Sequence, residues 1–328
     1  MRKAIGLTST VYQQAEREFG MLPLPVVLHA SAPDALAACW LMLRESLVVT
    51  GHVKRDTKEA VATTVSLSNG CTYCAQVQGM ALEALSATSP EDTEADHGVR
   101  RVADWARSGA SATTAARRVP FPLKHVPELV GVVLTFHYIN RMANIFLPDS
   151  PLPRGIPRAL RSRTLLMFSH LMRMALHAEH PPGASLDLLP TGPLASDLAW
   201  TRENPHVAEA FARAAVAIDA AGARSVPETV RNLLHRLLAN WTGELPDRFF
   251  IADAVAKLPP PDRPAGLIAV QTALASSQVD TATVVEFRKT RPTDESLVEL
   301  TSWASMSAAR RICTWITADL EEHESLHG

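Results

Sequence analysis

Hydrophobic residues recur three and four residues apart along most of the chain, which is the spacing of an amphipathic helix. In the first half this pattern predicts helices over residues 33–49, 56–69, 71–85, 99–107 and 127–147. In the second half it predicts helices that open at Asn204, Pro227 and Glu295. We therefore expect an all-α fold.

The second half of the chain repeats the order of the predicted helices. Each half opens with an apolar helix, continues with a helix that begins beside a glutamate, and ends with a long apolar helix. A proline-rich break at residues 148–153, with Pro157 just beyond it, separates the two halves. This order predicts two tandem helical repeats that arose by duplication, one in residues 1–150 and one in residues 151–328.

The segment around residue 70 joins two predicted helices. Asp56 can cap the first helix, with Glu59 at the third position closing a capping box, and the pair Asn69-Gly70 can end it. Gly70 is free to take the left-handed backbone conformation. The chain can therefore turn at once into a second helix that starts at Cys71.

Two cysteines, Cys71 and Cys74, occupy the first turn of this second helix. The unpaired amide hydrogens and the dipole at a helix N-terminus favour a thiolate, which is the form that attacks peroxides and disulfides. Their spacing also lets the two sulfurs form a disulfide with little backbone movement. The pattern indicates a redox dithiol, although two small core cysteines, with Glu59 only a surface capping residue, would show the same spacing.

Metal binding has weaker support in the sequence. Zinc would need two more ligands beside the cysteine pair, and no second CxxC or nearby Cys/His pair is present. His170, His177 and His180 lie close together, but no carboxylate beyond Glu179 stands at ligand spacing. We predict no metal and no bound cofactor.

Composition narrows the classes of partner and compartment. Of the 328 residues, 47% are hydrophobic and 20% are charged, and the net charge is −2. This balance gives no reason to expect nucleic acid or an anionic membrane as a partner, and no run of eighteen apolar residues could span a bilayer. Four cysteines without an even spread, and an N-terminal segment unlike a signal peptide, predict a reducing, cytoplasmic location.

A longer motif surrounds the cysteines. They stand within the sequence Asn69-Gly70-Cys71-Thr72-Tyr73-Cys74. With Glu59 before it and Trp40 further upstream, this order resembles the AhpD-like alkylhydroperoxidase branch of the carboxymuconolactone decarboxylase superfamily. The resemblance implies an all-helical fold, oligomers and a peroxide-reducing dithiol. By position, Cys74 would attack, Cys71 would resolve, and Glu59 would start a proton relay.

The resemblance is strong in the first half and weak in the second, where no cysteine lies near Asn240, so the second repeat is predicted to be degenerate.

The family usually has a histidine four residues after the second cysteine. Here that position is Gln78, whose amide can hydrogen-bond but cannot shuttle a proton at neutral pH. Gln78, Tyr73, Asn69 and His137 are the candidate relay or pocket residues.

These observations favour a thiol-dependent oxidoreductase that acts on a peroxide or a small disulfide and is regenerated by an external dithiol. Two alternatives stay open: a decarboxylase-like or isomerase-like enzyme in which Glu59 is the base, and a non-catalytic helical assembly protein. We also expect a homo-oligomer, because helices as apolar as residues 126–147 and 297–316 are more readily buried against other helices than left facing water.

Overall fold

The computed structural model describes residues 6–86, 94–115, 118–152, 159–160, 163, 167, 173–318 and 320. Every regular element within these residues is a helix, which confirms the all-α prediction. No helix in this part of the chain is long and apolar enough to cross a membrane. Pro153 and Pro157 of the predicted break, and His170, lie outside the described residues.

The first half contains all the helices that its hydrophobic pattern predicts. The predicted ones are α3 (Pro33–Leu43), α4 (Arg55–Ser68), α5 (Thr72–Ser86), α6 (Glu94–Ser108) and α7 (Val126–Phe146), and two that the pattern did not indicate, α1 (Leu7–Phe19) and α2 (Leu24–Val27), precede them. A π-helical turn, η1 (Arg44–Val48), continues α3 directly, and a short 3-10 helix, η2 (Leu123–His125), leads into α7. The helix predicted over residues 33–49 is therefore present, but it changes its hydrogen-bonding pattern at Arg44.

The second half contains the three predicted helices and several that the pattern did not indicate. The predicted ones are α9 (Pro205–Ser225), α10 (Glu228–Asn240) and α14 (Asp294–Ile316). Between them lie α11 (Arg248–Ala256), η5 (Pro260–Asp262), α12 (Arg263–Ala275), η6 (Ser276–Gln278) and α13 (Thr281–Thr290), and before them lie η3 (Leu186–Leu188) and η4 (Ser196–Thr201). Asn204 caps α9, because its side chain accepts a hydrogen bond from the N–H of Val207.

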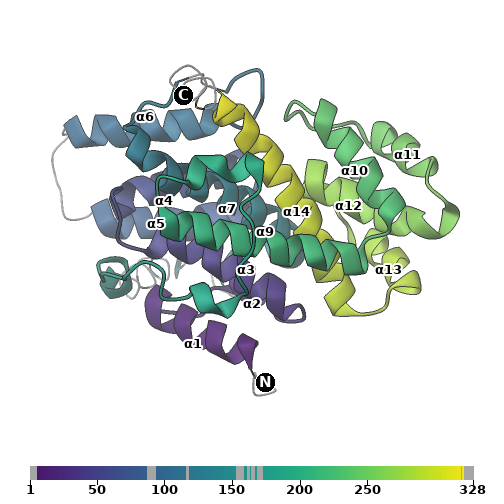
Figure 1. Ribbon diagram of the computed structural model, residues 1–328, viewed down its shortest axis with the longest axis horizontal. Coiled ribbons are helices and arrows are strands. Elements are labelled where there is room, and N and C mark those ends of the chain that lie inside the picture. The colour runs from purple at the N-terminus through teal and green to yellow at the C-terminus, as the bar shows by residue number, and fades with distance from the viewer. Residues whose placement is uncertain are drawn as a thin grey trace.

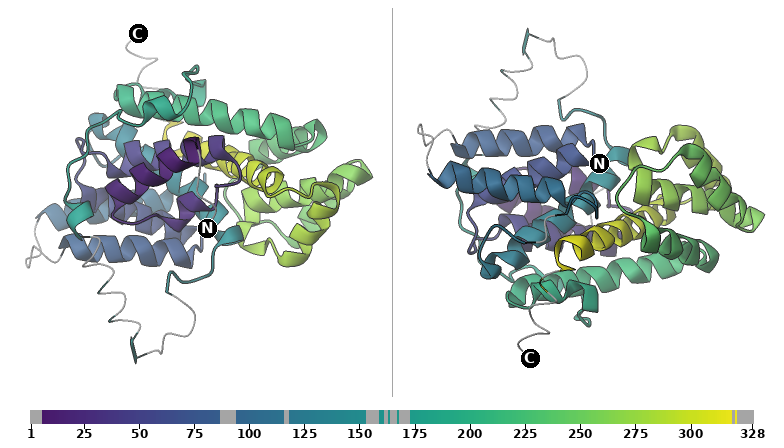
Figure 2. Two further views of the ribbon diagram at one scale, coloured as in Figure 1. Left: turned by 90° about the horizontal axis from the view of Figure 1, so that it is seen from below. Right: turned by 90° about the horizontal axis from the view of Figure 1, so that it is seen from above.

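Two long helices, α7 and α14, pack against each other in the middle of the molecule (Figure 1). Residues 126–143 of α7 are all buried. α3 packs against α9, and α9 packs against α14, while α10 to α13 gather at one end in each view (Figure 2). One continuous hydrophobic core therefore joins helices from both halves of the chain.

This packing brings together the helices that the predicted repeats make equivalent. α3 lies against α9 and α7 against α14, while α7 also touches α9 and α14 touches α3. Two copies related by a pseudo-twofold axis would give such self-matching contacts. The duplication and the homo-oligomer both stay predictions, and the apolar helices that led us to expect an oligomer are already buried within one chain.

The start of α4 differs from the prediction. The helix begins at Arg55, and no side chain caps it. Glu59 is fully buried and pairs with Arg55 one turn earlier, with 2.7 Å between Oε1 and Nε. The predicted capping box with Asp56 is therefore wrong, because Glu59 faces the protein interior and bonds along the helix to an arginine.

Several buried charges around η1 and α4 occur as close ion pairs. In η1, Arg44 places Nε 2.7 Å from Glu18 and Nη1 2.5 Å from Glu45. In α4, Lys58 places Nζ 2.6 Å from Glu128 of α7. Arg44 and Lys58 thus each have a carboxylate partner, which offsets the cost of several kcal/mol that burial of a single charge imposes.

Gly70→Ala is predicted to lower the free energy of unfolding by about 1–2 kcal/mol, because Gly70 has a φ of 62° and a side chain is strained in that region. A Cβ at Gly70 meets no atom within 4 Å, so the loss would come from the backbone alone. Gly79→Ala is the matched control. It also faces open space but lies inside α5, where alanine is favoured by about 1 kcal/mol. Urea unfolding compares the two variants, and equal effects would contradict the prediction.

Candidate active site

Two backbone hydrogen bonds hold the turn between α4 and α5. The N–H of Gly70 donates to the carbonyl of Leu67 at 3.1 Å, and the N–H of Cys71 donates to the carbonyl of Ser66 at 2.9 Å. With Gly70 in the left-handed conformation, these bonds form a Schellman motif. The motif places Cys71 immediately before α5. The helix therefore starts at Thr72, one residue later than the sequence predicted.

Cys71 takes the N-cap position of α5. The backbone N–H of Cys74 donates to its Sγ, with 3.4 Å between nitrogen and sulfur. The side-chain hydrogen bond with Cys74 is the main cause that lowers the pKa of Cys71; burial opposes it, and the backbone N–H adds to the lowering. The sulfur stands where a capping oxygen usually sits, so a thiolate is favoured there.

Cys74 shows the opposite shift. Its pKa is raised well above that of a free thiol, first by the hydrogen bond with Cys71, then by burial, and then by the charge of Cys71. The proton of the reduced pair is therefore held more tightly by Cys74 than by Cys71. Of the two thiols at this helix start, Cys71 is the more acidic.

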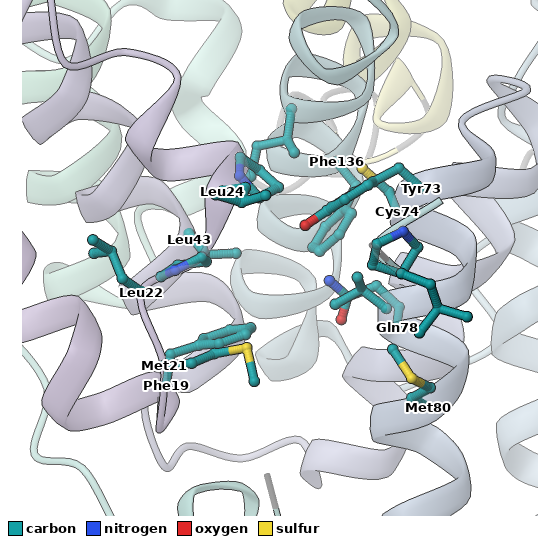
Figure 3. Close-up of a pocket in the computed structure, with 16 residues that line it drawn as sticks. Phe19, Met21, Leu22, Leu24, Leu43, Tyr73, Cys74, Gln78, Met80 and Phe136 are labelled. Atoms are coloured by element: carbon teal, nitrogen blue, oxygen red, sulfur yellow. The ribbon is translucent and has the colours of Figure 1, made fainter. Parts of the chain in front are cut away.

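Cys74 lies in the wall of a cavity of about 170 Å³. Tyr73 and Gln78 line the cavity beside it, and side chains from α1, α2 and α3 face them across the space (Figure 3). The larger apolar residues of the wall are Phe19, Met21, Leu22, Leu24, Leu43 and Phe136. Cys71 is not part of the lining, so Cys74 is the cysteine of the pair that borders the cavity.

Two polar side chains share this apolar cavity with Cys74. Burial, followed by the charges of Cys74 and Cys71, raises the pKa of Tyr73 to about 12, so its hydroxyl keeps its proton at neutral pH. Gln78 is buried one helical turn after Cys74, and its Oε1 has no hydrogen-bond partner among the described residues. Both side chains can hydrogen-bond to a polar group that enters the cavity.

Glu59 lies on α4, which packs against α5, but it does not line the cavity. Burial raises the pKa of its carboxyl group, and the charge of Arg55 opposes this shift. Its Oε2 has no partner within the described part of the chain. The carboxyl group therefore has one free oxygen and makes no hydrogen bond to Cys74 among the described residues.

Asn69 and His137 lie together at a different pocket. Asn69 Nδ2 is 3.0 Å from His137 Nδ1, and Arg141 Nη1 donates to the carbonyl of His137 at 2.8 Å. All three residues line a space of about 300 Å³ where the turn after α4 meets the end of α12. Of the predicted relay or pocket residues, the structure thus places Tyr73 and Gln78 beside Cys74, and Asn69 and His137 elsewhere.

The cavity wall formed by α1 and α2 is the part of the site that sequence reasoning missed. Phe19, Leu22 and Leu24 are ordinary apolar residues, and their spacing gives no signal that they face a cysteine far along the chain. Cys39 and Cys313 are fully buried free thiols, and burial raises the pKa of both, as expected for small core residues. No three His, Cys, Asp or Glu side chains of the described residues gather as a metal site.

Comparison with known proteins adds a relative that spans nearly the whole chain. No family model matches the sequence. The chain is 35% identical over 335 residues to the alkyl hydroperoxide reductase Rv2159c of Mycobacterium tuberculosis, and the match covers 98% of this chain and 94% of the relative. The chain belongs to the family of this alkyl hydroperoxide reductase. The match extends over both halves of the chain, and the name of the relative is consistent with the AhpD-like resemblance.

For this member of the alkyl hydroperoxide reductase family, we predict that Cys71 titrates below the pKa of about 8.5 of a free cysteine. Cys74→Ala should raise that pKa, because the side-chain donor is lost and only the backbone N–H remains. The ultraviolet absorbance of the thiolate, followed against pH, measures the Cys71 pKa in the unmodified chain and in Cys74→Ala. Cys71→Ala is the control and should remove the transition at low pH. If Cys74→Ala removed that transition instead, the thiolate would belong to Cys74.

Proposed function

We propose that the chain is a thiol-dependent reductase of organic hydroperoxides, with Cys71 and Cys74 as its redox dithiol. The observation that carries this proposal is the position of Cys74 in the wall of an apolar cavity, with Cys71 hydrogen-bonded to it from outside the lining. The printed name of the relative, an alkyl hydroperoxide reductase, points to the same chemistry.

The reaction starts with a proton transfer from Cys74 to Cys71. In this mechanism the Cys71 sulfur starts as the thiolate, because it is the more acidic of the two thiols, and its hydrogen bond with Cys74 makes it the base for this proton. It thereby takes the role that the family motif gives to a histidine where this chain has Gln78. The Cys74 thiolate then attacks the outer oxygen of the hydroperoxide, so that an S–O bond forms and the O–O bond breaks.

The leaving alkoxide takes the proton from Cys71 and departs as the alcohol. Cys74 is now a sulfenic acid, and the regenerated Cys71 thiolate attacks its sulfur. The disulfide forms and hydroxide leaves, which solvent protonates to water. One hydroperoxide is thus reduced to an alcohol and water while two thiols are oxidised. An external dithiol then reduces the disulfide by exchange, and the cycle needs no bound cofactor.

The cavity favours a hydroperoxide with an apolar body. Its volume of about 170 Å³ is similar to that of an engineered protein cavity of about 150 Å³ that binds benzene. Each Å² of apolar substrate surface that the walls bury contributes about 25 cal/mol, and hydrogen peroxide has no such surface. We therefore expect alkyl or aryl hydroperoxides to react in preference to hydrogen peroxide.

Glu59 fits a supporting role better than that of the catalytic base in a decarboxylase or isomerase. It is ion-paired with Arg55 and does not line the cavity. Glu59 Oε2 and Gln78 Oε1 are two buried acceptors without partners among the described residues, and α4 packs against α5. A water that donates to both would satisfy them and give Glu59 a path for protons to and from the site.

A peroxidase assay with dithiothreitol as reductant tests the proposal. We predict that kcat/KM for cumene hydroperoxide exceeds that for hydrogen peroxide by at least about tenfold, since about 1.4 kcal/mol of apolar burial gives that factor. Cys74→Ser and Cys71→Ser should both abolish turnover. Cys313→Ala, which removes a buried thiol away from the cavity, is the control and should keep it. Turnover that survives in Cys74→Ser would contradict the proposal.

Gln78→His should raise peroxide turnover by about ten- to hundredfold, because an imidazole one turn after Cys74 can take and give a proton near neutral pH. Adding Glu59→Gln should cancel this gain if both residues act in one relay. Gln76→His is the matched control, since Gln76 lies on the same helix but does not line the cavity. The pH dependence of kcat/KM compares the variants, and identical profiles would show that no relay operates here.

A further inference from the structure

The pocket that Asn69 and His137 line, which we call the junction pocket, has a composition that fits an anionic ligand. Besides these two residues its wall includes Arg141, Trp241 and Ser276, together with apolar residues of α12 and α14. Its described lining holds one arginine and no acidic side chain. His137 is neutral, because burial and then the charge of Arg141 hold its pKa well below the usual range.

Arg141 is a buried cation that has no carboxylate partner among the described residues. It is 6% exposed, and its hydrogen bonds go to neutral acceptors: Nε to the carbonyl of Ala273 at 2.9 Å, and Nη1 to the carbonyl of His137 at 2.8 Å and to Asn69 Oδ1 at 3.4 Å. No carboxylate of the described residues forms an ion pair with it. Carbonyl dipoles offset only part of the cost of burying a full charge.

Two other deeply buried cations of this protein are paired with carboxylates. Arg44 lies within hydrogen-bond distance of Glu18 and Glu45, and Lys58 lies 2.6 Å from Glu128. In those places the fold supplies the negative charge. At Arg141 the described residues supply no negative charge, so a molecule that enters the junction pocket can neutralise the guanidinium group.

One nitrogen of the Arg141 guanidinium group makes no hydrogen bond with the described residues. Nε and Nη1 bond to the protein, whereas Nη2 makes no hydrogen bond with any described residue. Trp241 fixes the group from one face, with 5.9 Å from Arg141 Cζ to the ring centroid. A fixed guanidinium with a free N–H edge in a pocket is the arrangement that binds carboxylates.

We propose that the junction pocket binds a small organic monocarboxylate. Its carboxylate accepts hydrogen bonds from Arg141 Nη2, and its apolar body lies against Trp241, Leu245 and Ile312. One carboxylate neutralises the single cation, whereas a phosphate dianion would leave a negative charge unmatched in a lining with no second cation. The apolar wall favours a hydrocarbon body over an inorganic ion.

The ligand would touch the turn that carries the dithiol. Asn69 and Gly70 line the junction pocket and directly precede Cys71, while Asn69 also bonds to Arg141. The Asn69 carbonyl accepts a hydrogen bond from Asn144 Nδ2 at 3.2 Å, and Asn144 bonds on to Ser276 of the same pocket. An acid bound there would therefore hold the turn between α4 and α5 in place. This proposal does not depend on the peroxidase function.

Isothermal titration calorimetry of the full chain with benzoate, hexanoate and benzamide tests the site at constant ionic strength. We expect one molecule of benzoate or hexanoate per chain, and binding of the uncharged benzamide at least tenfold weaker. Arg141→Gln should weaken benzoate binding by about ten- to hundredfold, the size of a hydrogen bond to a charged group. Arg311→Gln is the matched control, because Arg311 also stacks on a tryptophan and bonds a carbonyl, but outside this pocket.

The comparison of benzoate with benzamide in the unmodified chain decides the question even if Arg141→Gln fails to fold. Absence of saturable binding by both carboxylates would overturn the proposal, as would equal affinity for benzamide. Equal loss of binding in Arg311→Gln and Arg141→Gln would place the carboxylate elsewhere. Phosphate that binds as tightly as benzoate would show a general anion site and would also overturn it.

Discussion

The N-cap bond from the Cys74 amide to the Cys71 sulfur is the interaction on which the chemistry of this molecule depends. It exists because Gly70, at a φ of 62°, lets α4 end and α5 begin within one tight turn. The turn brings the two thiols together, and the side-chain hydrogen bond between them is the main cause of their different acidities, while the N-cap bond adds to the lowering of the Cys71 pKa. Gln78 lies about one helical turn after Cys74 on the same face of α5, so both residues line the same cavity.

The second half of the chain supports this turn although it has no cysteine pair. α4 packs against α5 and α7, and α7 is buried against α14. The helix that supports the dithiol segment is therefore itself held by a helix from the far end of the chain. A shared core of this kind explains in physical terms why the similarity to the alkyl hydroperoxide reductase extends over 98% of the chain.

Local features of the sequence were sufficient to predict much of this fold. The three- and four-residue period located α3, α4, α5 and α7, and the pair Asn69-Gly70 marked the turn, because these signals depend on neighbours within one helical turn. The capping box at Glu59 failed because a distant core decides which way that carboxylate faces. The same limit applies to the cavity wall from α1 and α2, whose approach to Cys74 is set by tertiary packing alone.

The residue types of the candidate site were predictable from the sequence, whereas the division of roles between the two cysteines came from the family resemblance and stays a prediction. The CxxC spacing identified both sulfurs, yet it gave no means to distinguish the capping thiol from the one in the cavity. Asn69 looked like a neighbour of the dithiol because it is close to Cys71 in sequence, and His137 because it is a polar residue within an apolar helix. The structure places their side chains toward Arg141 instead, since Asn69 ends one helix and Cys71 begins the next.

The central claim is that this dithiol, facing an apolar cavity, reduces an organic hydroperoxide by itself. A single-turnover experiment tests it most directly: reduced protein is mixed with one equivalent of cumene hydroperoxide in the absence of any other thiol. The account predicts one molecule of alcohol per chain, together with a Cys71–Cys74 disulfide and unchanged Cys39 and Cys313. Alcohol formed without the loss of these two thiols, or no alcohol at all, would contradict it.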